Sequence, residues 1–461
     1  MMKTAFLFPL LFSAQAAAAQ VFAIDLPAAS APASPFWVEQ VVDARPDRTM
    51  LGYVQQGLDN HLVPANFAHR LEEEVLHFVG PQPAASGMRP VVLRIHRLKI
   101  AEETRASSER ANAEVMADFL LRDGQQFYPL LSVSLGAESK GLDVTKQHAG
   151  NLAKILTSAL LQLAALPPTS QPSAGTAPLT LAQVQQGAGF QPYQFPIQKT
   201  LTPQRGFYRT LEEFQNNSPN PDTAPFELIR KPRTGKQWAG QPDIDALLLK
   251  PSFSGTRAPV RGVWGLSDGQ NAYIFQRGSY FLLTPSGAAY TFTGFAPVDP
   301  NDALTGVVLG GMFGLAGGVA AAALAGGKEP MPYELSVITG NLVAQRPAND
   351  FATADTAAVY LYRRAATSAG PPLQVLVDGK EAGTLGPEQY LALTWHDRRR
   401  DMTICLLDEQ RTCYTLVPLF GTATYLNYAQ NKDTHQPAVQ PMPTKEGAFH
   451  LKHLRLREPR H

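Results

Sequence analysis

The sequence has little charge and very little cysteine. Of its 461 residues two are Cys, and charged residues make up 17%, below the roughly 25% of an average soluble protein. The formal net charge is +1 at pH 7, and no run of Lys and Arg interleaved with aromatic residues precedes the carboxy terminus. Because nucleic acid is bound largely through clustered positive charge, we expect no nucleic-acid partner. A chain of this length is expected to form two to four domains.

Sequence motifs that carry chemistry are also missing. There is no GxSxG elbow, HExxH helix, Walker loop or dinucleotide-binding glycine fingerprint. His396 and Asp397 are adjacent, so on a strand they would point to opposite faces. His61, His69 and His77 are eight residues apart, which turns them by about 80° on a helix, too far for joint ligation. We therefore expect structural roles for these residues and predict no catalytic site, metal or cofactor.

The amino terminus has the three parts of a secretory signal. Lys3 precedes an apolar run over residues 5–12, and small residues follow at 16–19. We expect residues 1–19 to be a signal peptide that is cleaved after Ala19. No Cys follows the Ala run, so the lipid-attachment pattern of bacterial lipoproteins is missing. The chain is therefore predicted to be exported, to the periplasm or outer membrane.

Residues 303–325 form a long segment without any charge. As a helix rising 1.5 Å per residue it would be long enough to cross the ~30 Å hydrocarbon layer of a membrane. A stripe of small residues would let helices pack closely in lipid. We predict a glycine-zipper helix over 301–328 that lies in or against a membrane; a helix packed inside protein is the alternative, because Gly and Ala make the segment only mildly apolar. The glycines in step are Gly306, Gly310, Gly314 and Gly318.

The two cysteines are predicted to form a disulfide. Cys405 and Cys413 lie on short β runs on either side of a polar turn, so their sulfurs would meet across a hairpin. An oxidising compartment favours their pairing, and two free buried thiols are the alternative. A single membrane crossing by 303–325 would place Cys405 on the opposite side from the domain before it. A helix that lies against an outer membrane or assembles with its own copies avoids this conflict.

Residues 36–166 have the pattern of an α/β domain. Alternating strands are predicted over 36–44, 91–100, 113–121 and 127–135, with a helix opened by Pro64 and a closing helix capped by Asp143. The run Val-Val-Asp-Ala-Arg-Pro at 41–46 resembles small periplasmic α/β domains of bacterial envelope lipoproteins. In such domains Asp43 and Arg45 would close the loop after the first strand, as exposed charges.

The middle of the chain combines a linker with a β meander. Residues 167–200 are rich in Pro, Ser, Thr and Gln and are predicted to be a linker. Over 203–300, four short strands alternate with turns, and their aromatic residues are expected to be core. The block at 206–219, where Thr210 would cap a short helix, resembles exported proteins of Bacteroidetes-type bacteria whose function is unknown.

The carboxy-terminal region is predicted to be a β-sandwich over 333–430. A Tyr-x-Tyr-Arg strand at 360–363 and a Val-Asp-Gly-Lys hairpin at 377–380 resemble a family of small bacterial envelope β-domains of unknown function. That resemblance implies residence in the cell envelope and brings no catalytic residues. Residues 431–461 are predicted to be a basic tail. Its end, 450–460, alternates apolar and basic residues and is expected to be a last strand or a loose end, with attraction to anionic lipid or polysaccharide.

Together these patterns predict an α+β multidomain protein: an N-terminal α/β domain, a central β meander with a glycine-zipper helix, and a C-terminal β-sandwich. The expected function is non-catalytic: scaffolding or self-association of an exported envelope protein at a membrane. Its expected partners are membrane lipid or another envelope component, and copies of itself in a homo-oligomer. The alternative is a secreted hydrolase of glycan or peptide, with a site built from carboxylates scattered along the sequence.

Overall fold

The computed structural model describes residues 21–457, apart from short gaps and two longer ones. It divides into two compact units, one from Ala23 to Asn349 and the other including Asp350 to His461, and each is described by itself. Both are rich in strands, so the expected β-rich multidomain fold is confirmed. The residues left out between 21 and 457 are 29–31, 57–60, 81–86, 106–107, 173–174, 222–223, 234, 239, 252–254, 297–328, 345–353, 365–369, 408–410 and 431–436.

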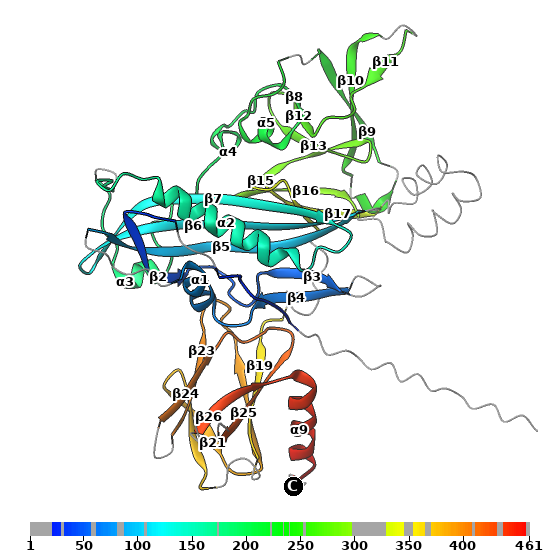
Figure 1. Cartoon of the computed structure of the whole chain (residues 1–461). Helices are drawn as coiled ribbons and strands as arrows, with labels where there is room; N and C mark the ends of the chain where they lie inside the picture. The colour runs from blue at the N-terminus through cyan, green and yellow to red at the C-terminus, as the bar shows by residue number, and fades with distance from the viewer. Residues whose placement is uncertain are drawn as a thin grey trace, which may run out of the picture. The chain divides into compact units, whose positions relative to one another are not determined.

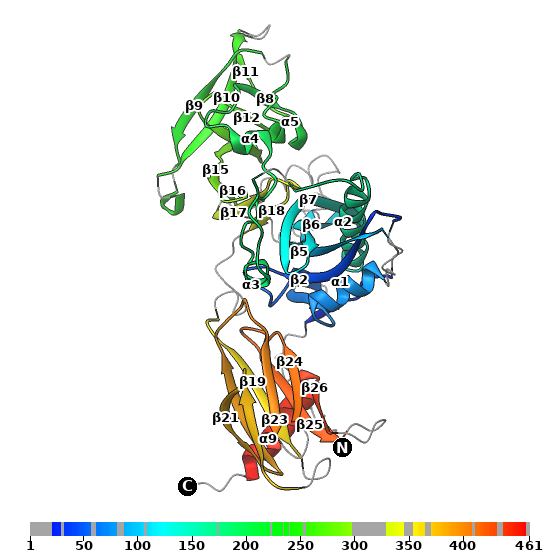
Figure 2. The ribbon, with the colours of Figure 1, turned by 90° about the vertical axis from the view of Figure 1, so that its left-hand side faces the viewer.

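The first unit begins with a sheet covered by helices. Its strand order is β1-β4-β3-β5-β6-β7, and β2 pairs in parallel with β5. Helices α1 and α2 lie on one face of this sheet and α3 on the other (Figure 2). The elements are β1 (Phe22–Ile24), β2 (Phe36–Asp43), β3 (Gly52–Gln56), β4 (His61–Phe67), α1 (Leu71–Val79), β5 (Arg89–Arg105), β6 (Ser108–Asp123), β7 (Gln126–Gly141), α2 (Gln147–Ala164) and α3 (Leu181–Gln185).

Periodicity located most of these elements but misplaced two helix starts. The first helix does not open at Pro64, because Val63, Ala65 and Phe67 alternate as buried residues of β4, and α1 begins at Leu71. Helix α2 begins after Lys146 rather than at a cap on Asp143. Its predicted inward face is confirmed. The buried positions are Leu152, Ile155, Leu156, Ala159, Leu160 and Leu163.

The segment predicted as a linker is largely folded onto this sheet. Leu179 pairs with Phe127 in an isolated β-bridge, and the Thr180 hydroxyl caps α3 in a capping box with Gln183. Val184 of α3 is fully buried against Val42, Val92, Leu120 and Phe127. The expectation of a linker over 167–200 is therefore wrong, because this segment buries Val184 and pairs backbone groups with the sheet.

The rest of the first unit is the β meander, arranged as two sheets. The strand orders are β11-β10-β14-β13-β12-β8, with β9 on β10, and β15-β16-β17-β18. The elements are α4 (Pro196–Lys199), β8 (Gly206–Tyr208), α5 (Leu211–Gln215), β9 (Phe226–Pro232), a 3-10 turn (Lys236–Trp238), β10 (Pro242–Pro251), β11 (Arg257–Pro259), β12 (Gly265–Ser267), β13 (Ala272–Gln276), β14 (Ser279–Leu282), β15 (Thr284–Ser286), β16 (Ala289–Phe295), β17 (Pro330–Ser336) and β18 (Leu342–Ala344).

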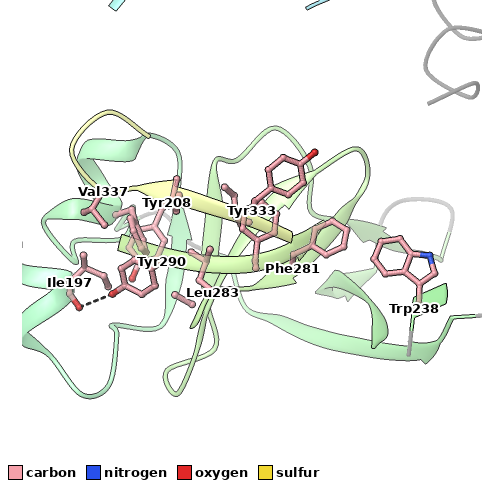
Figure 3. Close-up of a cluster of buried hydrophobic side chains, with 13 residues drawn as sticks. Ile197, Tyr208, Trp238, Phe281, Leu283, Tyr290, Tyr333 and Val337 are labelled. Atoms are coloured by element: carbon pink, nitrogen blue, oxygen red, sulfur yellow. Dashed lines mark hydrogen bonds between the residues drawn. The ribbon is translucent and has the colours of Figure 1, made fainter. Parts of the chain in front are cut away.

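Aromatic side chains fill the core between these sheets, as predicted. Tyr208, Phe281, Tyr290 and Phe292 belong to one buried cluster (Figure 3), and the Thr210 hydroxyl caps α5 by accepting from the Glu213 amide. In this unit β17 pairs with β16, and β18 pairs with β17. The predicted start of the last domain at residue 333 is therefore wrong, since residues 330–344 complete the meander.

The second unit has two sheets with a shared hydrophobic core. Their strand orders are β22-β19-β25-β26 and β21-β20-β23-β24. Leu361 and Leu426 from the first sheet meet Val375 and Ile404 from the second. The elements are β19 (Ala357–Arg363), β20 (Leu373–Val377), β21 (Lys380–Leu385), β22 (Gln389–Trp395), β23 (Met402–Leu407), β24 (Arg411–Leu416), β25 (Ala423–Gln430), β26 (Pro437–Met442) and α9 (Thr444–Arg457), all labelled or coloured in Figure 1.

Residues 444–457 form a helix, where a tail or a last strand was predicted. Residues 437–442 form β26, which pairs with β25, and the alternating stretch that follows is the helix α9. Its inward residues Leu451 and Leu454 pack on Tyr362 and Tyr425. Alternation of apolar and basic residues was misleading because apolar residues also recur three apart, at the spacing of a helix face.

No helix among the described residues is long and apolar enough to cross a membrane. The predicted glycine-zipper helix over 301–328, with Gly306, Gly310, Gly314 and Gly318, lies outside the described residues.

Candidate functional site

The predicted disulfide is confirmed. Cys405 on β23 and Cys413 on β24 are directly opposed register partners, with Cα atoms 4.0 Å apart, and their sulfurs are bonded. Cys405 is buried, whereas Cys413 is exposed. The neighbouring hairpin also forms as predicted, with Asp378 and Gly379 both at positive φ (51° and 78°), the geometry that a two-residue type I′ turn requires.

The histidines singled out in the sequence do not come together as a site. His396 is exposed next to the turn that follows β22, and the Asp397 carboxylate accepts from the Arg399 amide instead of orienting it. His69 precedes α1 and His77 lies on it, whereas His61 is on β4. Among the described residues no group of three His, Cys, Asp or Glu side chains is placed to hold a metal ion.

Charged side chains gather instead on the face of the first sheet that α2 does not cover. Along β6, odd-numbered residues from 111 to 121 are apolar, whereas the even-numbered residues include Arg110, Asn112, Glu114 and Asp118. Nearly all of β6 from residue 111 to 121 is buried. We call the set Arg94, His96, Arg97, Arg110, Asn112, Glu114 and Asp118 the polar face. The signal in the sequence is the alternation that predicts a strand over 113–121: polar residues at every second position of a buried strand imply a polar partner.

At one end of the polar face, a buried ion pair holds the α3 segment. Arg94 is fully buried and donates to both carboxylate oxygens of Asp118, at 2.9 and 2.6 Å. It also donates to the carbonyl oxygens of Val184 (3.4 Å) and Ala188 (2.7 Å). Burial alone would raise the pKa of Asp118, but the hydrogen bonds from Arg94 and His96 outweigh it and lower the pKa. The carboxylate is therefore ionised and held in place.

His96 completes this contact. Its Nε2 lies 3.1 Å from Asp118 Oδ1, and its ring stacks on Phe190 with centroids 3.6 Å apart. A β-bulge between Ile95 and Arg97 accompanies this arrangement. Residues 179–190 are thus joined to the sheet by two hydrogen bonds from Arg94 to carbonyl oxygens and by the stacking of His96 on Phe190. The Asp118 carboxylate holds both of these side chains in place, so residues 179–190 are part of the first unit.

Further along the polar face, a second charge cluster holds strand β17. Arg97 donates to Glu114 and, at 2.8 Å, to Glu334, while Ser336 Oγ donates to Glu114. Lys99 Nζ lies 3.7 Å from Glu334. Burial raises the pKa of Glu334, but Lys99 and Arg97 outweigh this and lower it. Both carboxylates are engaged by cations from β5, so the cluster ties β17 to the first sheet.

The hairpin held in this way leads into residues 297–328. Phe295 of β16 faces Pro330 of β17, and the Ala296 amide donates to Glu329 O at 2.9 Å. Tyr333 Oη donates to Phe295 O at 2.6 Å. Ala296 and Glu329, the described residues on either side of 297–328, are therefore fixed side by side at the end of the β16–β17 pair.

An aromatic cluster surrounds Phe295 at the end of β16. Trp238 and Phe281 both contact the Phe295 ring edge-on, with centroids 5.4 and 5.2 Å away. The Arg233 guanidinium lies 4.3 Å from the Trp238 centroid and 5.0 Å from that of Phe295, an arrangement that cation–π attraction favours. Trp238, Phe281 and Tyr333 are labelled in Figure 3. The residues where the chain leaves the sheet are thus rigidly packed.

Beyond the second cluster, at residues 110 and 112 of β6, part of the polar face stays open toward the meander. There a cavity of about 180 Å³ is lined by charged and amide groups of β6 and β7, by the turn between β17 and β18, and by aromatic residues of the meander. Arg110 donates to Glu138 across its floor at 3.1 Å. The lining residues are Arg110, Asn112, Glu138, Trp264, Ile274, Phe275, Thr339, Gly340, Asn341 and Leu342.

Two further pairs of ionisable side chains have structural roles. One was predicted from the sequence and the other was not. Asp43 and Arg45 close their loop, as expected, but they are buried rather than exposed, and Arg45 also donates to Met50 O. His148 at the start of α2 is fully buried, and its Nε2 lies 2.9 Å from Glu102. Glu102 in turn accepts from the Gln55 amide. Both sets bind the chain to itself.

Comparison with known proteins adds little. No protein-family model and no curated protein matches the chain. Among solved structures, protein XCC0632 from Xanthomonas campestris, of family DUF330, aligns with 32% of this chain and 93% of its own length, at 16% identity and a TM-score of 0.21. A similarity at that TM-score supports no conclusion about fold or function.

Proposed function

We propose that the chain is a non-catalytic, exported protein of the cell envelope that scaffolds, or associates with its own copies, at a membrane through residues 301–328. The secretory pattern of residues 1–19 and the disulfide between Cys405 and Cys413 support export to an oxidising compartment. The Asp118 and Glu114 carboxylates of the polar face are already held by Arg94 and Arg97, which supports structural roles for them over hydrolysis. We infer the finer layout to be an N-terminal α/β domain, a central meander that bears the glycine-rich segment, and a C-terminal β-sandwich.

The proposal depends on one observation, that the residues on either side of the glycine-rich segment, Ala296 and Glu329, are paired on adjacent strands. As a helix, residues 303–325 would be about 34 Å long. Ala296 and Glu329, which stand on either side of the segment and its short links, are hydrogen-bonded to each other. After a single crossing the chain could return to this pair only as an extended link through the hydrocarbon layer, where its backbone groups would lack hydrogen-bond partners. The segment is therefore best suited to entering or lying on one side of a membrane, or to packing against copies of itself.

This geometry also removes the conflict over sidedness. When both ends of the segment stay on one side, the chain after it remains in the same compartment as the chain before it. Cys405 and Cys413 then reside in the oxidising space that their bond requires. Periplasm or outer membrane is thus our proposed location, with membrane lipid or an envelope component, and further copies of the chain, as partners.

The first test is membrane extraction and cross-linking of the full-length chain. Carbonate washing is expected to leave the protein in the membrane, and cross-linked oligomers should disappear in Gly310→Leu/Gly314→Leu. Gly150→Leu is the matched control, because Gly150 is an exposed helical glycine with open space around it. A protein that washes off as a monomer, with or without the substitutions, contradicts the proposal.

Sidedness is tested with single introduced cysteines. Ser286→Cys and Glu329→Cys place thiols at exposed positions on either side of the segment in sequence. A membrane-impermeant maleimide should label both from the same side, while the native disulfide stays unreactive. Labelling from opposite sides would show a single crossing and refute the hairpin geometry.

A further inference from the structure

Helix α9 is held with one defined face inward. Gly447, Leu451 and Leu454 are buried, three or four residues apart, against the outer surface of the sheet that contains β25. A Cβ atom on Gly447 would lie 2.3 Å from the Cβ of Tyr425, so the helix backbone sits directly on this strand. Arg455 also turns toward the sheet, where its guanidinium lies 5.4 Å from the Tyr360 ring and 5.5 Å from the Tyr390 ring. The rotation of the helix is therefore fixed.

The opposite face of α9 presents two large apolar side chains to solvent. Phe449 is 57% exposed and Leu456 is 70% exposed. They are seven residues apart, which places them two turns, or about 10 Å, along one line of the helix. Within the described part of the second unit, these are the large hydrophobic side chains with substantial exposure. Singly exposed leucines are common on protein surfaces, but two aligned on one helix face form a continuous strip.

Positive charge flanks this strip. The charges come from Lys445 and Lys452, which lie within the same arc of about 100° as Phe449 and Leu456. The imidazole of His453 lies in this arc as well, and all three side chains are exposed. The carboxylate of Glu446 lies at the edge of the arc and is 3.5 Å from His450 Nε2. The helix thus carries a local excess of Lys and Arg in a chain whose net charge is only +1. A surface that combines exposed apolar residues with lysines is complementary to a lipid layer that has anionic headgroups and an apolar acyl region.

We propose that the strip formed by Lys445, Phe449, Lys452, His453 and Leu456 docks the second unit on the surface of an anionic lipid bilayer. This proposal rests on the proposed membrane location, and it assigns a second, separate contact to it. Phe449 and Leu456 would enter the boundary between headgroups and acyl chains, while the lysine ammonium groups reach lipid phosphates. Two apolar side chains hold a protein only weakly, so binding is reversible and needs anionic headgroups, each lysine strengthening it about fivefold.

The test measures binding of the full-length chain to vesicles of phosphatidylcholine alone and of phosphatidylcholine mixed with phosphatidylglycerol. Embedding through residues 303–325 does not depend on headgroup charge or salt, whereas docking through α9 does. The expected result is a salt-sensitive gain in affinity on the mixed vesicles. This gain should fall about tenfold or more in Phe449→Ser/Leu456→Ser and in Lys445→Gln/Lys452→Gln.

Matched controls separate this strip from general surface properties. Leu142→Ser/Leu201→Ser removes two leucines that are 87% and 98% exposed in the first unit, and Lys380→Gln/Arg399→Gln removes two exposed cations of the second unit. Both controls should keep the gain on anionic vesicles. Equal loss in controls and strip variants, or no dependence on phosphatidylglycerol, overturns the proposal.

Two results distinguish its failure from that of the proposed function. Carbonate-resistant embedding that persists without any headgroup-dependent gain refutes the α9 contact alone. A headgroup-dependent gain without embedding refutes the role of residues 301–328 alone. Loss of a dimer in light scattering of the Phe449→Ser/Leu456→Ser variant, with vesicle binding unchanged, would show that a second copy of the chain covers this face and would overturn lipid docking.

Discussion

Replacing Arg94 by Met should release the α3 segment from the first sheet. The substitution removes two hydrogen bonds to Asp118, of 2.9 and 2.6 Å, and leaves the carbonyl oxygens of Val184 and Ala188 without their donor. The carboxylate of Asp118, which is 1% exposed, then keeps the His96 contact at 3.1 Å. Because water cannot replace the lost guanidinium at this depth, the site must bear a buried charge or take up a proton.

Both routes lead to a similar cost. Breaking one half of a buried ion pair typically destabilises a protein by about 3–5 kcal/mol. Protonating an Asp with an ordinary pKa of about 3.9 at pH 7 costs about 4 kcal/mol, at 1.36 kcal/mol per pH unit. We therefore expect Arg94→Met to lower the free energy of unfolding by about 4 kcal/mol at pH 7. The loss should appear first as faster amide exchange and proteolysis over residues 179–190.

A double variant supplies the control. In Arg94→Met/Asp118→Leu no charge remains buried, so most of the lost stability should return, as when buried pairs are replaced by packed apolar residues. Exchange over 179–190 would stay faster than in the wild type, because the carbonyl acceptors remain unpaired. If the single variant loses less than about 1 kcal/mol, or if single and double variants lose equally, the assigned role of this pair is wrong.

The same pair predicts an acid dependence. The folded-state pKa of Asp118 is lowered, so its contribution to stability is fully present above the unfolded pKa of about 3.9 and is lost as pH falls through the lower folded value. The contribution of Asp118 to the protection of residues 179–190 against amide exchange should therefore be constant from neutral pH down to about pH 4. Below about pH 4 this contribution should fall. This component of the acid transition should be missing in Arg94→Met/Asp118→Leu.

Two further outcomes follow from the structure. The disulfide joins cysteines with a sequence separation of 8, so Cys405→Ala/Cys413→Ala should cost about 2–3 kcal/mol by loop-closure entropy; an unchanged urea midpoint of the second unit would contradict this. A Cβ on Gly136 would lie 2.5 Å from Thr339 Cγ2, so Gly136→Val should cost about 1–3 kcal/mol by overpacking and speed amide exchange over residues 336–341. Gly150→Ala, with open space around it, should instead stabilise by about 0.4–1 kcal/mol, and equal effects at both glycines would refute the contact.

Local pattern was sufficient wherever the physical cause is itself local. The inward face of α2 follows from residues that recur every three or four positions, and the β20–β21 hairpin follows from Asp378-Gly379, which accepts the positive φ of a tight turn. Cys405 and Cys413 could be paired from sequence because a hairpin with a polar turn between short strands sets their register. These features depend on neighbours within about ten residues.

The polar face could be seen in the sequence only as an alternation. Residues 110–118 show that β6 has a polar side, but which cation meets which carboxylate depends on segments far apart in the chain. Arg97 pairs with Glu334, 237 residues away, and Arg94 reaches the carbonyl of Ala188, 94 residues away. Such pairings are decided by how sheets and loops pack, which no local pattern records.

From its sequence alone the chain was determined to be charge-poor, β-rich and multidomain, with a disulfide hairpin and an uncharged glycine-rich segment. Tertiary structure decided that the supposed linker docks through α3, that β17 returns to β16 after the glycine-rich segment, and that the last residues form a helix with an exposed strip. The physical reason is that composition and periodicity describe what each segment tends to bury, whereas the partner against which it is buried is chosen by the whole fold.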